Sequence, residues 1–82
     1  MIDKIYKDLM VKFLVLNYPV KRLKRGRHFR RGIRMDNGEP YFLSDKSQSL
    51  PLYTRLVKIL ILVFDCREEE SRDVVATFLN IT

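Results

Sequence analysis

A run of positive charge places the strongest limit on how this chain can fold. Residues 20–34, VKRLKRGRHFRRGIR, contain eight Lys or Arg side chains and no Asp or Glu. Mutual repulsion among these side chains costs stability unless an anion is bound or the backbone holds them apart. Gly26 and Gly32 interrupt the run, and glycine is unfavourable inside a helix. We therefore do not expect a continuous arginine-rich helix here.

The positive charge is local and does not extend over the whole chain. The net charge is +6, and residues 20–34 contribute +8, so the other residues together sum to −2. A concentrated field attracts anionic partners, whereas a diffuse one mainly aids solubility. The sequence therefore predicts a slightly acidic body that carries one basic surface.

Length and composition predict one folded domain over residues 1–82. The hydrophobic fraction of 46% is too high for a disordered chain. A domain of this size is only marginally stable alone, so a homodimer is a possible state. The single cysteine, Cys66, excludes an internal disulfide, and MIDKIYKDLM does not resemble a signal peptide. Because the longest apolar run, Ile59–Phe64, is too short to span a bilayer, we expect a cytoplasmic protein without a membrane partner.

The N-terminal segment has the pattern of an amphipathic helix. Apolar side chains recur at spacings of three and four between Ile2 and Leu16. Asn17 suits a helix C-terminus, and Pro19 cannot continue the hydrogen-bond ladder. The pattern predicts a helix over about residues 2–16.

The stretch HFRRGIRM-DNGEP-YFLSD predicts a β-hairpin after an irregular basic loop. Asn37-Gly38 is the preferred dipeptide of a two-residue type I′ turn, which sets Asp36 opposite Glu39. Pro40 suits the start of an edge strand, because it has no N–H to donate. This register places Ile33, Met35 and Phe42 on the face expected to be buried, and Arg30, Arg34 and Tyr41 on the other.

Two helices are expected after the polar linker SDKSQS. Ser49 can cap a helix over residues 50–64 with Pro51 in its first turn. Residues 59–64 also fit a strand, but the length of the apolar stretch favours a helix. Asp65 and Glu68 match a D-x-x-E capping box that starts a helix over residues 66–80. The predicted order is α-β-β-α-α, an α+β domain with its helices on one face of the hairpin.

The basic loop and hairpin of residues 20–45 are the predicted binding surface for nucleic acid. Arginine outnumbers lysine six to two between residues 20 and 34, which favours bidentate recognition of phosphate or guanine. Phe29 and Tyr41 are aromatic groups that can stack on an unpaired base. DNA and RNA both fit this chemistry. The predicted contacts are Lys21, Arg22, Lys24, Arg25, Arg27, His28, Arg30, Arg31, Arg34 and Tyr41.

The positive charge of residues 20–34 also has two explanations that involve no nucleic acid. An acidic protein partner can dock on the surface, which would make the chain an adaptor or an inhibitor. Alternatively, the protein's own acidic residues can neutralise it. These are Asp65, Glu68, Glu69, Glu70 and Asp73.

The sequence predicts no enzyme, metal or cofactor site. His28 is a candidate general base, with Arg30 or Arg31 to stabilise developing charge, but a lone histidine among arginines is more often a phosphate contact. Cys66 is expected to pack. The consecutive carboxylates of residues 68–70 point in different directions around a helix, and their place in a first turn is explained by the helix dipole.

Residues 23–43, LKRGRHFRRGIRMDNGEPYFL, resemble the basic hairpin of RelE-type ribosome-dependent ribonucleases, which carry arginines on paired strands. The resemblance implies a small ribonuclease as a third function. The resemblance is limited to composition, because those proteins continue into further strands, whereas this chain is expected to continue into helices. A ribbon-helix-helix repressor fits less well, since here a helix precedes the basic strand.

Overall fold

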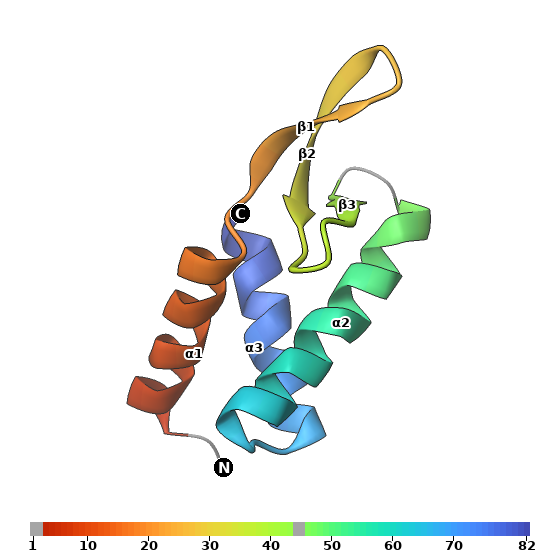
Figure 1. The fold of residues 1–82 in the computed structure, drawn as a ribbon. Helices are drawn as coiled ribbons and strands as arrows, with labels where there is room; N and C mark the ends of the chain where they lie inside the picture. The colour runs from red at the N-terminus through yellow and green to blue at the C-terminus, as the bar shows by residue number, and fades with distance from the viewer. Residues whose placement is uncertain (1–2, 44–45) are drawn as a thin grey trace.

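A computed structural model describes the backbone of residues 3–43 and 46–82, and the side chains of residues 3–43 and 50–82 (Figure 1). The elements are α1 (Lys4–Asn17), β1 (Lys21–Arg25), β2 (His28–Arg34), β3 (Pro40–Phe42), α2 (Lys46–Phe64) and α3 (Glu68–Ile81). The strands form one antiparallel sheet in the order β1-β2-β3. The α+β class is confirmed, and the observed order, α-β-β-β-α-α, contains one more strand than predicted.

The predicted N-terminal helix is confirmed as α1, with ends shifted by one or two residues. Asp3 caps it, because its side-chain oxygen accepts a hydrogen bond from the N–H of Ile5 at 2.9 Å. The helix ends where Tyr18 N–H donates to the carbonyl of Leu14 at 2.8 Å. Met10 and Leu14 are the buried residues of α1, so this part of its apolar stripe faces the core, while Ile5, Leu9 and Leu16 remain exposed.

The additional strand, β1, lies in the segment predicted to be a loop. It pairs with β2 from Lys21 opposite Gly32 to Arg25 opposite His28. Gly26 begins the two-residue turn between them with a φ of 61°. A positive φ at the first central position is typical of a type II′ hairpin turn, which glycine adopts without steric cost. The loop prediction is therefore wrong for residues 21–25.

The second turn differs from the predicted two-residue turn and shifts the register by one residue. Met35 N–H donates to Glu39 O, and Gly38 N–H donates to Met35 O, both at 2.9 Å. The positive φ of 85° falls on Gly38, while Asn37 is not among the residues with positive φ. Because a type I′ turn requires a positive φ at both central residues, the arrangement is a three-residue loop that ends in a left-handed glycine.

The shifted register corrects which side chains share a face. Ile33 pairs with Tyr41, and Gly32 pairs with Phe42. Phe42 therefore lies on the face opposite Ile33, and Tyr41 lies on the same face as Ile33. Both placements reverse the prediction, although Ile33, Met35 and Phe42 are all buried as expected.

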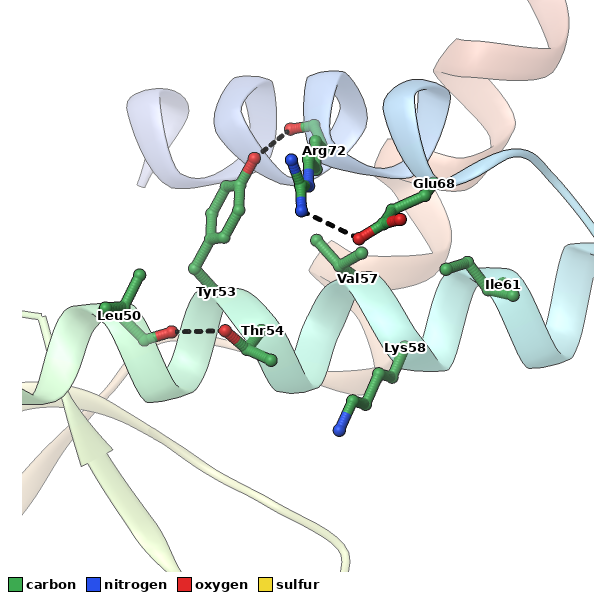
Figure 2. A pocket seen from close by; sticks show the side chains of 8 residues that line it. All are labelled: Leu50, Tyr53, Thr54, Val57, Lys58, Ile61, Glu68 and Arg72. Carbon is green, nitrogen blue, oxygen red and sulfur yellow. Dashed lines mark hydrogen bonds and ion pairs between the residues drawn. The ribbon is translucent and has the colours of Figure 1, made fainter.

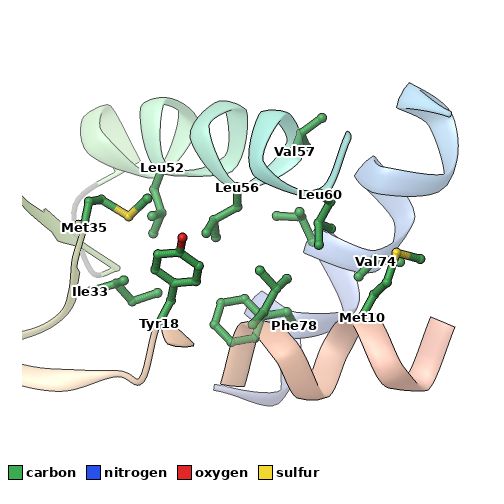
Figure 3. Packing of buried hydrophobic residues seen from close by; sticks show 12 residues of the cluster. Met10, Tyr18, Ile33, Met35, Leu52, Leu56, Val57, Leu60, Val74 and Phe78 are labelled. Atoms are coloured by element: carbon green, nitrogen blue, oxygen red, sulfur yellow. The ribbon is translucent and has the colours of Figure 1, made fainter. Parts of the chain in front are cut away.

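The main core lies between the Ile33 face of the sheet and the three helices (Figure 3). α3 packs against both α1 and α2, and α2 also packs against β3. The expectation that the helices lie on one face of the hairpin is thus confirmed. The largest fully buried side chains are Phe78, Met10, Leu14, Ile33, Leu52, Leu56, Leu60, Val74 and Val75.

The starts of the last two helices differ from the predictions. α2 begins at Lys46, so Pro51 lies inside the helix and Ser49 does not precede it. Asp65 has a φ of 52°, and its N–H donates to Ile61 O at 3.0 Å. It therefore terminates α2 in the left-handed conformation that aspartate tolerates. Arg67 is the N-cap of α3 and makes no side-chain capping bond, so the predicted capping box is wrong. Residues 59–64 are helical, as predicted.

Candidate nucleic-acid interface

The predicted basic surface is a two-stranded ribbon that projects from the helical body (Figure 1). We call residues 21–34 the basic hairpin; it comprises β1, the Gly26-Arg27 turn and β2. Its projection contributes to the elongated shape of the molecule, which measures 44 × 21 × 18 Å. All eight Lys and Arg side chains of the basic hairpin are exposed, and so is His28.

Positive charge occurs on both faces of the basic hairpin. Residues directly opposite on paired strands share a face, and successive residues alternate between faces. The Leu23 face carries Lys21, Arg25, His28, Arg30 and Arg34. The Phe29 face carries Arg22, Lys24 and Arg31. Arg27 lies in the turn at the tip.

Two cross-strand pairs of the basic hairpin join basic side chains, one of them two arginines and the other an arginine and a histidine. Arg22 lies directly opposite Arg31 on the Phe29 face. Arg25 lies opposite His28 beside the turn. Like charges in directly opposed positions destabilise a strand pair. Hairpin stability therefore does not explain why arginine occupies both positions 22 and 31.

An apolar contact fixes the root of the basic hairpin. Leu23 and Phe42 are buried, with 6% and 5% of their surfaces exposed, on the face away from the helical core. Gly32 lies between them, and a Cβ placed on it would be 3.1 Å from Leu23 Cδ1 and 3.4 Å from Phe42 Cα. The Arg25 guanidinium carbon lies 5.3 Å from the centroid of the Phe42 ring. The sequence prediction missed this contact, although a glycine inside a strand can signal close backbone approach.

Acidic residues at the start of α3 engage partners away from the basic hairpin. Glu68 pairs with Arg72 at 2.8 Å, and Asp73 pairs with Lys7 of α1 at 2.8 Å. The start of α3 and the tip of the basic hairpin lie at opposite ends of the molecule (Figure 1). This arrangement argues against neutralisation of the tip by the C-terminal acidic cluster.

Phe29 and Tyr41, the two aromatic candidates, occupy different environments. Phe29 is 54% exposed, and the Arg22 guanidinium carbon lies 5.5 Å from its ring centroid. Tyr41 is half-buried at the root, packs against the core, and donates its hydroxyl hydrogen to Glu39 Oε2 at 3.2 Å. The fold therefore brings Phe29, but not Tyr41, together with the distal cations.

The remaining predicted contacts fall into a distal and a root group. Arg34 is at the root, where its Nη1 donates to Gly38 O at 2.7 Å. Lys21 also lies at the root, opposite Gly32. The distal group consists of Arg22, Lys24, Arg25, Arg27, His28, Arg30 and Arg31.

A groove lies between α2 and α3, outside the basic hairpin (Figure 2). It has a volume of about 370 Å³, and Val57 and Ile61 are among its apolar lining residues. Three of the polar residues that line it are joined to each other, since Tyr53 OH donates to Arg72 O at 3.2 Å and Arg72 pairs with Glu68, while Lys58 also lines the groove. The groove therefore presents few free polar groups to orient a ligand.

Cys66 packs within the fold, as expected. Its Sγ lies 2.8 Å from Ser71 Oγ and donates to Leu60 O at 3.6 Å. Among the side chains of residues 3–43 and 50–82, the structure gathers no group of three or more His, Cys, Asp or Glu that could hold a metal ion.

Exposed apolar side chains on α1 bear on the expected homodimer. Ile5, Leu9 and Leu16 expose 71%, 54% and 79% of their surfaces. Such side chains are common singly on protein surfaces, and they do not identify a partner by themselves. Homodimer formation stays a prediction.

Comparisons of this chain with protein-family models, with curated proteins and with solved structures found no match. Over the part of the chain that the structure describes, no helix combines the length and hydropathy needed to cross a bilayer. The function therefore has to be inferred from the chemistry of the basic hairpin.

Proposed function

We propose that this protein binds nucleic acid through the basic hairpin. The observation that carries the proposal is a projecting ribbon with eight exposed cations, far from the acidic start of α3. Each Lys or Arg that meets a phosphate releases condensed counterions, so affinity grows with the number of contacts. The proposed location is the cytoplasm, in keeping with a single free cysteine, Cys66.

The distal cations are the main proposed contacts. Arg22, Arg30 and Arg31 present planar guanidinium groups that can bind phosphate oxygens through two hydrogen bonds. Lys24 adds a mobile point charge beside Phe29 on the opposite strand. Lys21 and Arg34 lie nearer the body and serve as flanking contacts.

The test is fluorescence anisotropy with labelled DNA and RNA oligonucleotides, single- and double-stranded, over a range of salt concentrations. Lys24→Ala should weaken binding for all sequences and, with duplex DNA, reduce the salt slope by about 0.9. Lys58→Ala is the matched control, because it removes the same charge from an exposed position on α2. It should leave the slope unchanged. Equal effects of the two variants would contradict a role for the basic hairpin.

The remaining functions are outcomes of the same experiment. If no oligonucleotide binds below about 10⁻⁴ M near physiological salt, even the usual non-specific range is missed, and an acidic protein becomes the favoured partner. If labelled RNA is cleaved and His28→Ala abolishes the cleavage, the protein is a ribonuclease. Binding without turnover supports nucleic-acid binding as the function.

A further inference from the structure

We infer that the nucleic acid bound by the basic hairpin is double-stranded DNA, and that the tip of the hairpin enters the major groove. This inference rests on the proposed function and specifies its ligand. It follows from the distribution of charge over the two faces, from the dimensions of the ribbon, and from the scarcity of exposed aromatic groups.

The charge distribution favours a ligand with phosphates on both sides of the ribbon. Arg22, Lys24 and Arg31 lie on the Phe29 face, while Arg30 lies on the Leu23 face. A single strand that follows one face leaves the cations of the other face without phosphate partners. A groove has one phosphate backbone along each wall, so a ribbon inside it can neutralise charge on both faces.

The dimensions of the ribbon match the major groove of B-form DNA. Packed sheets lie about 10 Å apart, which approximates the thickness of one layer with its side chains. The B-form major groove is about 12 Å wide and about 8.5 Å deep, and it admits a two-stranded ribbon. At about 3.3 Å per residue, the last two or three residue pairs before the Gly26-Arg27 turn reach this depth. The major groove of A-form RNA is deep and narrow, so it does not admit the same ribbon.

The aromatic content of the ribbon argues against single-stranded ligands. Proteins that bind single strands stack successive bases on several aromatic side chains. The basic hairpin contains no Tyr or Trp and a single Phe, Phe29, and the guanidinium of Arg22 already lies over its ring. Electrostatic contacts therefore outweigh stacking on this surface.

The turn places Arg27 where it can reach the bases. Arg27 is exposed at the tip, between Gly26 and the first residue of β2. Arginine binds guanine O6 and N7 in the major groove through two hydrogen bonds, and this is the commonest specific contact to a base. We assign Arg27 to the base edges and the cations on the two faces to the phosphate walls.

The first test compares three ligands of the same sequence and length by anisotropy at one salt concentration: a DNA duplex, an RNA duplex and single-stranded DNA. The DNA duplex should bind more tightly than either of the others by roughly tenfold or more. Equal or tighter binding of RNA duplex or single-stranded DNA would overturn the inference but would leave the proposed function standing. Failure of all three, and of single-stranded RNA, to bind would overturn both the inference and the proposed function.

The second test examines the two faces separately. Arg31→Ala on the Phe29 face and Arg30→Ala on the Leu23 face should each reduce the salt slope for duplex DNA by about 0.9. Lys58→Ala on α2 is the control and should have no effect. If one face alone changes the slope, the ribbon lies on the surface of the duplex and not inside a groove. Circular dichroism of each variant checks that the fold is unchanged.

The third test locates the hairpin in the duplex. Dimethyl sulfate methylates guanine N7, which faces the major groove. Bound protein should protect guanines from this reagent, and Arg27→Ala should remove the protection while retaining most of the salt-dependent affinity. Unprotected guanines in a saturated complex would refute major-groove entry.

Discussion

Replacing Gly32 with alanine should weaken the sheet at the root of the basic hairpin. A Cβ built on Gly32 would lie 2.6 Å from the backbone carbonyl oxygen of Tyr41 and 3.1 Å from Leu23 Cδ1. A carbon-to-oxygen contact requires about 3.3 Å, so the carbonyl would have to retreat by about 0.7 Å. The obstacle is backbone on a paired strand, which moves only if β3 separates from β2.

The expected loss of stability is about 1–3.6 kcal/mol. Overpacking of a well-filled site costs about 1–3 kcal/mol, and a weakened ladder hydrogen bond adds about 1 kcal/mol. Alanine recovers about 0.4–1 kcal/mol, because it restricts the unfolded chain more than glycine does. The assay is urea unfolding followed by circular dichroism, in which the midpoint should fall while the slope stays constant.

A second substitution separates the backbone obstacle from the side-chain obstacle. Leu23→Ala removes the contact at 3.1 Å but leaves the Tyr41 carbonyl in place. Gly32→Ala should therefore cost nearly as much in the Leu23→Ala background as in the wild type. A Gly32→Ala variant as stable as the wild type would refute the reasoning, and so would a cost that disappears in the double variant.

Two further predictions concern the body of the domain. Burial, followed by the charge of Asp36 and the hydrogen bond to it at 3.3 Å, raises the pKa of Tyr18 above its usual value of 10.0. The raised pKa favours the neutral phenol in the folded state. The resulting contribution to the free energy of unfolding is complete below about pH 10, and it is lost as pH rises through the pKa of Tyr18 in the folded protein. Urea unfolding on either side of pH 10 measures how much free energy of unfolding each variant loses at alkaline pH. This loss should be smaller for Tyr18→Phe than for the control Tyr53→Phe, and equal losses would contradict the role of Tyr18. Asp65→Gly should raise the free energy of unfolding by up to about 1 kcal/mol, because glycine adopts the φ of 52° without strain; a lower urea midpoint would show that the aspartate side chain stabilises this corner.

The helices were predictable because each one buries a face. The spacing of apolar residues in α1 and the length of the apolar stretch in α2 carry that information directly. β1 was not predictable in the same way, since only Leu23 of its five residues is buried. A ribbon that projects into solvent has little or no buried face along its length, so the alternation that identifies strands is absent.

The register was not predictable because one dipeptide serves two kinds of turn. Asn37-Gly38 fits the central positions of a two-residue loop, and it equally fits the last two positions of a three-residue loop. The difference of one residue moves both Phe42 and Tyr41 to the face of the sheet opposite the one predicted for each. The same ambiguity applies to Asp65, whose D-x-x-E pattern suits a capping box but whose backbone ends the preceding helix.

The composition of the candidate site was predictable, but its geometry was not. The sequence alone identifies the cations of residues 21–34. Their division between the two faces depends on β1 and on its pairing with β2, neither of which the sequence pattern revealed. The proposed binding in a groove therefore depends on the fold.

The charge and the anchoring of the basic hairpin have opposite effects on its stability. Arg22 opposite Arg31 destabilises the distal ribbon, while Leu23 and Phe42 stabilise its root. A polyanion that binds the basic hairpin when its strands are paired, and not when they are separated, stabilises the paired strands by mass action. The stabilisation is RT ln(1 + [L]/Kd). The pairing of the distal strands is thus linked to ligand binding, and amide exchange in β1 and β2 should slow when duplex DNA is added. Slower exchange only at the root would mean that the distal cations do not hold the ligand.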